Sequence, residues 1–200
     1  MVTIASIGDG TPEEDYEARL RLTSTAIALL SQEDAFAKYD AFLVASFSDH
    51  PLTKALKSRT SKPVTDVFHA SINFARTCVR NDGFFGLVGM GSTRGGHGLM
   101  VSALEFIGRD PQFARAVCTG YHTADIYLDE YRTRVIHATA TAVRDLVWDK
   151  YYPCEVVVLG VGCNILKKEV MEAVGDHVVV IDSYSAGLNE LAGIIHSLAC

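Results

Sequence analysis

Short, nearly continuous apolar runs alternate with helix-like stretches along this chain, and this alternation constrains the fold more than any other feature. Runs without polar alternation are typical of parallel strands that are covered on both faces. The sequence therefore predicts an α/β fold with parallel sheets flanked by helices. The expected strands are Val2 to Ile7, Ala41 to Ala45, Pro63 to Val67, Phe84 to Met90, Ala116 to Thr119, Val156 to Val161 and Val178 to Ile181.

Two parts of the chain share a strand–helix–strand–helix pattern, which predicts two pseudo-symmetric lobes with a crevice between them. The run that ends at Ser46 can be aligned with the run that ends at Cys163. The second strand of the two copies ends at Asp66 and Asp182, respectively. A chance likeness between two such units is the alternative, because they share a small set of patterns. The expected lobes are residues 1–82 with 183–200, and residues 83–182.

The composition limits the classes of function. Apolar residues make up 48% of the 200 residues and charged residues 21%, which is typical of a globular chain with a sizeable core. The formal net charge of −6 argues against a nucleic-acid partner, because phosphate binding needs clustered Lys and Arg. We find neither a run of about 18 apolar residues nor a signal segment, so we expect no membrane partner. Five cysteines without CxxC spacing indicate free thiols and predict a cytoplasmic protein.

Cys163 is the first candidate for chemistry. It follows a Gly160-x-Gly162 turn at the end of an expected strand and precedes a helix. Ligands of α/β proteins bind at the carboxyl ends of strands, and a helix N-terminus favours a thiolate and lowers the pKa of a thiol. A buried structural cysteine is the alternative, since cysteine is among the commonest core residues.

The glycine-rich loop after Met90 is a second candidate. Its backbone N–H groups, with the hydroxyls of Ser92 and Thr93, are suited to hold an anion or a carbonyl oxygen. It matches neither a P-loop nor GxGxxG, and a tight turn without a ligand is the alternative. The seven histidines lack HxH and HExxH spacing, so we expect no metal site. Ser46 and Asp49-His50 lack the G-x-S-x-G elbow of a serine hydrolase.

Taken in order, these motifs resemble the aspartate/glutamate/hydantoin racemase superfamily, and most closely its hydantoin and allantoin racemase branch. The likeness runs from the first expected strand to the last helix. Each motif is weak alone, and the resemblance rests on the occurrence of all four in the right order. The matching segments are Ser46 to Leu52, Pro63-Val64 into His69-Ala70-Ser71, Gly91-Ser92-Thr93, and Leu159 to Cys163 followed by Val180-Ile181-Asp182.

The resemblance implies a cofactor-independent enzyme with two acid–base groups on opposite faces of one carbon. Cys163 takes the position of the family's second catalytic cysteine, whereas Ser46 takes the position of the first and should be a poor base. The resemblance also implies that the first lobe lacks the family's first strand and helix. The implied substrate-binding residues are Phe47, Ser92, Thr93, Gly162 and Asn164.

The sequence therefore predicts a racemase for allantoin or another 5-substituted hydantoin, with activity lowered by Ser46. A decarboxylase or isomerase of the same fold that uses Cys163 alone is one alternative. A binding protein that keeps the pocket without the chemistry is another. The expected partners are a small-molecule substrate and further copies of the chain in a homo-oligomer.

Overall fold

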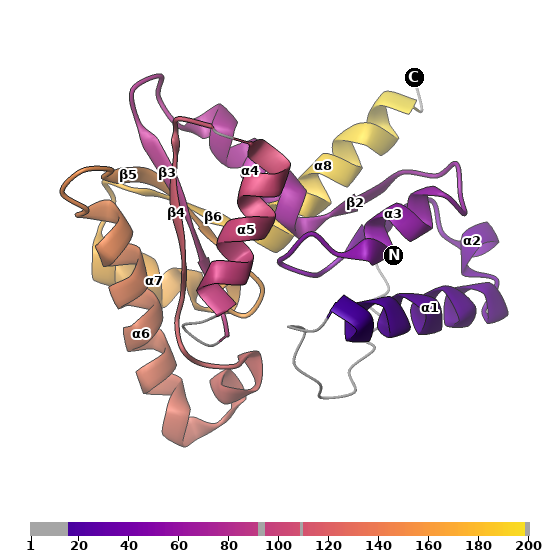
Figure 1. Ribbon diagram of the computed structural model, residues 1–200, viewed down its shortest axis with the longest axis horizontal. Coiled ribbons are helices and arrows are strands. Elements are labelled where there is room, and N and C mark those ends of the chain that lie inside the picture. The colour runs from indigo at the N-terminus through magenta and orange to yellow at the C-terminus, as the bar shows by residue number, and fades with distance from the viewer. Residues whose placement is uncertain (1–15, 92–94, 109, 199–200) are drawn as a thin grey trace.

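The computed structural model describes residues 16–91, 95–108 and 110–198, and it has the α/β architecture expected from the sequence (Figure 1). Helices and strands alternate along most of the chain. The expected strand over residues 2–7 lies outside the described residues. The elements are α1 (Tyr16–Gln32), α2 (Ala35–Lys38), β1 (Phe42–Val44), α3 (Pro51–Lys57), β2 (Val64–Asp66), α4 (Val67–Cys78), β3 (Phe84–Gly89), α5 (Gly95–Ile107), β4 (Phe113–Cys118), the 3-10 helix η1 (Thr123–Tyr127), α6 (Asp129–Val147), β5 (Cys154–Leu159), the 3-10 helix η2 (Cys163–Leu166), α7 (Lys167–Val174), β6 (Val179–Asp182) and α8 (Ser183–Leu198).

The described strands form two parallel sheets. One has four strands in the order β4-β3-β5-β6, and the other pairs β1 with β2. Within the smaller sheet, Phe42 lies beside Val64 and Val44 beside Asp66. Parallel strands need crossover connections, and the helices between successive strands supply them. The division of the chain into lobes at residues 82 and 183 stays a prediction.

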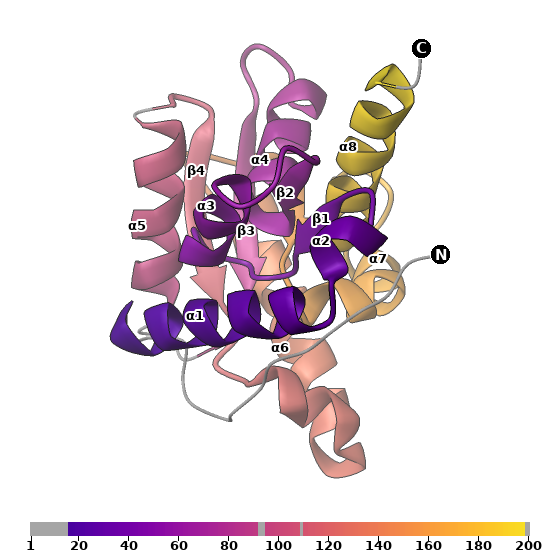
Figure 2. The ribbon, with the colours of Figure 1, turned by 90° about the vertical axis from the view of Figure 1, so that its right-hand side faces the viewer.

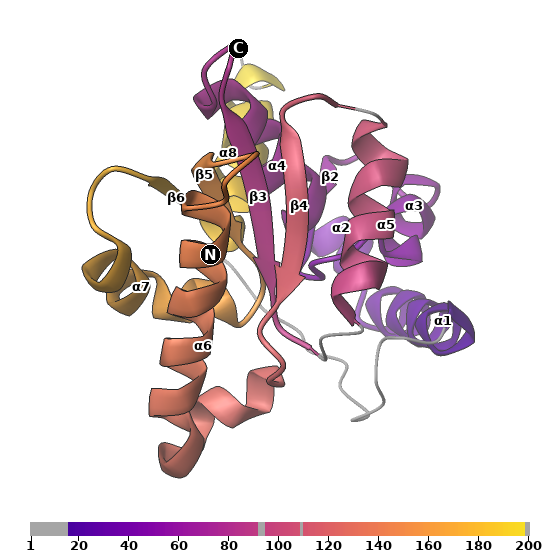
Figure 3. The ribbon, with the colours of Figure 1, turned by 60° about the vertical axis from the view of Figure 1, so that its left-hand side comes forward.

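Helices cover both faces of the four-stranded sheet (Figure 3). On one face, buried residues of α4, α5 and α8 meet those of the strands, among them Phe68 and Phe85. On the other face, α6 and α7 pack on the sheet through residues such as Val143, Leu146 and Val170. The strands are buried on both sides, which explains why they read as continuous Val- and Leu-rich runs in the sequence.

The two-stranded sheet carries its own smaller core, built from α1, α2 and α3 (Figure 2). Helix α8 joins this part to the rest. A Cβ added to Gly187 of α8 would lie 2.8 Å from Leu43 Cδ1 and 3.3 Å from Val67 Cγ1, so α8 lies close against β1 and the start of α4. Among the described residues, no helix has the length and apolar character that a membrane crossing requires.

Short-range signals explain where several helices begin. Asp66 is the N-cap of α4, and its carboxylate accepts a hydrogen bond of 2.7 Å from the His69 N–H. Asp182 accepts one of 2.9 Å from the Tyr184 N–H at the start of α8. The two aspartates that the repeat places at equivalent positions therefore both satisfy backbone donors at helix starts. Helix α3 begins with Pro51, and His50 Nδ1 accepts from the Leu52 N–H.

Candidate active site

Ser46 lies two residues beyond the end of β1, at the carboxyl edge of the small sheet. Its side chain is buried, with 8% exposure, and its hydroxyl shares a hydrogen bond of 3.1 Å with the Ser48 hydroxyl. A hydroxyl in this position can orient a ligand by hydrogen bonding. It is a poor base at neutral pH, because a serine hydroxyl is a far weaker acid than a cysteine thiol.

Cys163 is fully buried at the start of η2, in the cluster that packs between the sheet and α6. Burial raises the pKa of its thiol from an ordinary 9.0 to about 12, the nearby Cys118 adds to the rise, and a hydrogen bond with Thr139 offsets it in part. The expectation of a lowered pKa is therefore wrong for this conformation. A four-residue 3-10 turn provides only a short dipole, and the loss of hydration outweighs it.

Phe47 connects the small sheet to the large one. A Cβ added to Gly160, directly after β5, would overlap the Phe47 ring, and one added to Gly89 at the end of β3 would lie 3.8 Å from Phe47 Cδ1. The ring also meets Phe68 edge-on at 5.6 Å between centroids. The carboxyl ends of β1, β3 and β5 therefore come together around Phe47, which covers the strand end that leads to Cys163.

A hydrogen bond joins Gly162 and Asn164, the residues on either side of Cys163. Gly162 has φ 88°, a conformation that favours glycine, and its N–H donates to Asn164 Oδ1 at 3.0 Å. A Cβ there would lie 2.8 Å from Met90 Cγ and 3.0 Å from Thr123 Oγ1, so the turn is closely packed. The expected ligand contacts of Gly162, Asn164 and Phe47 stay predictions. Ser92 and Thr93 lie outside the described residues.

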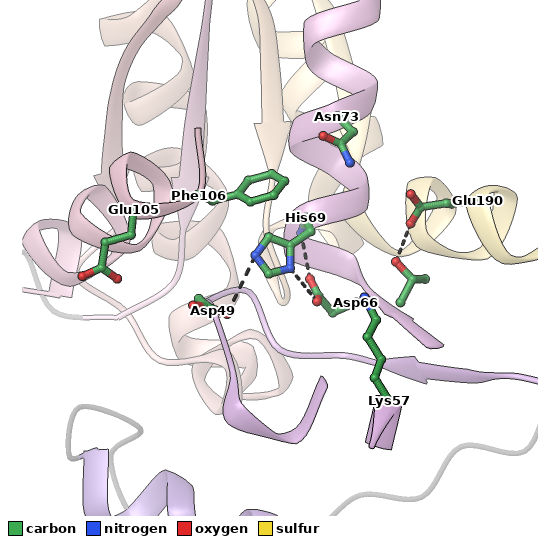
Figure 4. Close-up of a pocket in the computed structure, with 9 residues that line it drawn as sticks. Asp49, Lys57, Asp66, His69, Asn73, Glu105, Phe106 and Glu190 are labelled. Carbon is green, nitrogen blue, oxygen red and sulfur yellow. Dashed lines mark hydrogen bonds and ion pairs between the residues drawn. The ribbon is translucent and has the colours of Figure 1, made fainter. Parts of the chain in front are cut away.

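A cavity of about 480 Å³ opens on the side of the molecule where α3, α4, α5 and α8 approach one another (Figure 4). The sequence did not point to it, because its walls come from five elements. Most of its lining is polar, and four of its residues are acidic. The lining residues are Asp49, Lys57, Thr65, Asp66, His69, Asn73, Glu105, Phe106 and Glu190.

His69 lies at the centre of this cavity, between two carboxylates. Its Nδ1 is 2.7 Å from Asp66 Oδ2, and its Nε2 is 3.8 Å from Asp49 Oδ1. The Asp66 side chain is 1% exposed, that of His69 23% and that of Asp49 55%. The buried carboxylate therefore holds the ring from behind while the far nitrogen is turned toward the cavity (Figure 4).

The remaining walls combine an aromatic ring with charged groups. The Phe106 ring lies 4.2 Å from the His69 ring between centroids. Across the cavity, the Thr65 hydroxyl donates a hydrogen bond to Glu190. Lys57 is the cationic side chain among the lining residues, against Asp49, Asp66, Glu105 and Glu190. The signal available in the sequence was the Asp66-x-x-His69 spacing at a helix start. From the sequence, His69 was assigned only to the family motif and Asp66 only to the end of a strand.

In the ranges 16–91, 95–108 and 110–198, no group of three or more His, Cys, Asp or Glu side chains is arranged to hold a metal ion. A histidine paired with a carboxylate is an arrangement that general acid–base catalysis uses.

Comparison with known proteins gives a matching family model and a related sequence. The model of the family described as Asp/Glu/Hydantoin racemase matches residues 3–191. A Schizosaccharomyces pombe protein described as uncharacterized is 29% identical over 176 residues, which cover 86% of this chain and 70% of that protein.

Solved structures share the fold. The allantoin racemase from Klebsiella pneumoniae superimposes with a TM-score of 0.71 at 19% identity, covering 92% of this chain and 71% of its own. The allantoin racemase from Pseudomonas fluorescens gives 0.69 at 20% identity, with coverage of 88% and 71%. The glutamate racemase RacE1 from Bacillus anthracis gives 0.69 at 19% identity, with coverage of 92% and 67%.

Proposed function

We propose that this chain, which belongs to the Asp/Glu/hydantoin racemase family, racemises a 5-substituted hydantoin such as allantoin. The single observation that carries the choice of substrate is the charge of the cavity around His69, where four carboxylates stand against one ammonium group. Two of the similar solved structures are allantoin racemases, which supports the same choice.

The charge distinguishes between the substrate classes of the family. Glutamate and aspartate carry two carboxylates and one ammonium group, and the resulting net negative charge is placed beside Asp49, Glu105 and Glu190, which weakens binding. A hydantoin ring is neutral and presents N–H donors, which carboxylates accept well. Lys57 and Asn73 can donate to its carbonyl oxygens. The cavity is also large enough for a ligand of this size, at about 480 Å³.

In the proposed reaction, a base removes the proton from the ring carbon, and the electron pair moves to the adjacent carbonyl oxygen. A second group then delivers a proton to the opposite face. The thiol of Cys163, whose pKa is raised to about 12 by burial, is protonated at neutral pH and suits the delivering role. Because the Phe47 ring covers the strand end that leads to Cys163, this step requires the ring to move off Gly160. Ser46, Ser92, Thr93, Gly162 and Asn164 contact the ligand in this proposal.

A second candidate is a decarboxylase that uses Cys163 alone. The protonated thiol favours it, because loss of CO₂ leaves an enolate that needs a proton and no base. The acidic cavity disfavours it, since the substrate would be a carboxylate. Release of CO₂ from a panel of malonate-type acids distinguishes this reaction from racemisation.

The proposal includes a homo-oligomer in the cytoplasm. The four cysteines within the described part of the chain, Cys78, Cys118, Cys154 and Cys163, carry free thiols, which fits a reducing compartment. Helix α8 exposes apolar side chains at 37% to 72% of their area, which suits burial against another copy. These are Leu188, Ile194, Ile195 and Leu198.

Polarimetry tests the proposed function. The purified protein is mixed with one enantiomer each of allantoin, 5-methylhydantoin, glutamate and aspartate, and the optical rotation is followed. We expect rotation to decay for the hydantoins alone, and to decay more slowly with Cys163→Ser, because serine is a much weaker acid than a thiol. Decay for glutamate or aspartate but for neither hydantoin contradicts the proposal.

A further inference from the structure

We propose that His69, held by Asp66, is the acid–base residue of the small sheet and supplies the proton transfer for which Ser46 is unsuited. The inference rests on the proposed function and names a residue for its base. The observation behind it is the juxtaposition of an Asp–His pair with a cavity at the strand ends where Ser46 also lies.

The position of His69 follows from the pairing of β1 with β2. Val44 and Asp66 are register partners in the parallel ladder. Ser46 follows Val44 by two residues, and His69 follows Asp66 by three, so both leave the sheet at the same edge. The contact of 3.8 Å between His69 Nε2 and Asp49 Oδ1 links the two segments beyond that edge. A base at His69 therefore serves the same end of the sheet as a thiol at position 46 would.

Asp66 sets the tautomer of the His69 imidazole. Its Oδ1 accepts the His69 backbone N–H at 2.7 Å, and its Oδ2 lies 2.7 Å from Nδ1. A carboxylate at this distance places the proton on Nδ1 and leaves the lone pair on Nε2, which faces the cavity. This division of roles is the one that an orienting carboxylate has toward a histidine base.

Aromatic neighbours hold the ring in place on its other sides. Phe106 lies at 4.2 Å and Phe68 at 5.3 Å between centroids, the latter edge-on. Phe68 is fully buried in the core, so this side of the ring rests on a rigid part of the molecule. A base that is fixed in this way loses little freedom when substrate binds, which favours catalysis by orientation.

The step balances as a proton transfer. His69 Nε2 takes the proton from the ring carbon, and the C–H electron pair moves onto the adjacent carbonyl oxygen as an enolate. The imidazolium can return a proton to the same face, which restores the starting enantiomer, or a donor on the opposite face completes the inversion. In D₂O, the imidazolium exchanges its proton with solvent, so deuterium enters the ring carbon with retention of configuration.

Deuterium incorporation at the ring carbon of each 5-methylhydantoin enantiomer, followed by ¹H NMR, tests the inference. His69→Gln should slow the exchange of one enantiomer by about 10²–10⁴-fold, the range for one general acid–base group. Asp66→Asn, which keeps an N-cap side chain, should slow the same exchange. His137→Gln, on an exposed part of α6 across the four-stranded sheet, is the matched control and should leave the rate unchanged.

A second readout separates positioning from folding. In ¹⁵N NMR of the unmodified protein, His69 should carry its proton on Nδ1, and Asp66→Asn should move it to Nε2. Full exchange by a folded His69→Gln protein overturns the inference and leaves the proposed function standing, as does an Nε2–H tautomer in the unmodified protein. Absence of exchange by the unmodified protein on every hydantoin overturns both.

Discussion

Gly160→Ala tests whether the Phe47 ring covers the end of β5. The new Cβ would overlap the ring, so the ring or the backbone has to shift. Overpacking of this kind is unfavourable by about 1–3 kcal/mol. Replacing glycine by alanine restricts the unfolded chain and offsets roughly 0.4–1 kcal/mol of this. We expect the free energy of unfolding to fall by about 1–2 kcal/mol, which corresponds to roughly 2–8 °C in Tm for a chain of this size.

The assay is urea denaturation followed by circular dichroism, with two comparisons. Gly193→Ala on α8 is the matched control, because its Cβ would meet no atom within 4 Å, and it should stabilise by roughly 0.5–1 kcal/mol. Combining Gly160→Ala with Phe47→Ala should remove the penalty, since the clashing ring is gone. An unchanged penalty in the Phe47→Ala background, or stabilisation by Gly160→Ala alone, refutes the reasoning.

The remaining predictions concern titration, capping and assembly. Burial raises the pKa of the Cys163 and Cys154 thiols from 9.0 to about 12, so between pH 9 and 12 the unfolded chain loses protons that the folded chain keeps. Unfolding free energy measured by denaturant titration should therefore fall as pH rises above 9, by up to about 1.4 kcal/mol per unit per thiol, and Cys163→Ala should lower the slope by the share of one thiol. Asp66→Ala should destabilise by roughly 0.5–2 kcal/mol through the lost N-cap, with a smaller effect for Asp66→Asn; equal effects in thermal melts would exclude capping as the cause. Light scattering at micromolar concentration should give at least the mass of a dimer, and a monomer mass contradicts the proposed assembly.

The sheets were predictable because each strand carries its own signal. Runs such as Val156 to Val161 are apolar throughout, and this pattern can be recognised without knowing which strands are neighbours in the sheet. The sequence placed Asp66 and Asp182 at strand ends that precede helices, and their capping contacts with the backbone lie within three residues. The family resemblance then followed from the order of the strand-end motifs, and the family model confirms it.

The cavity was beyond the reach of the sequence, because it depends on contacts between distant segments. Glu190 accepts from Thr65 across 125 residues, and Phe106 reaches His69 from another helix. The pKa of Cys163 was predicted in the wrong direction for the same reason. Its strand-end position was visible in the sequence, whereas its burial against Thr139 of α6 depends on tertiary packing.

A crystal structure of the Cys163→Ser protein with allantoin tests the central claim most directly, because the substitution is expected to slow turnover while keeping the cavity. The account predicts the hydantoin ring in the cavity beside Phe106, with its ring carbon facing His69 Nε2 and its N–H groups donating to the surrounding carboxylates. Allantoin bound elsewhere on the chain, or with its ring carbon turned away from His69, would contradict it.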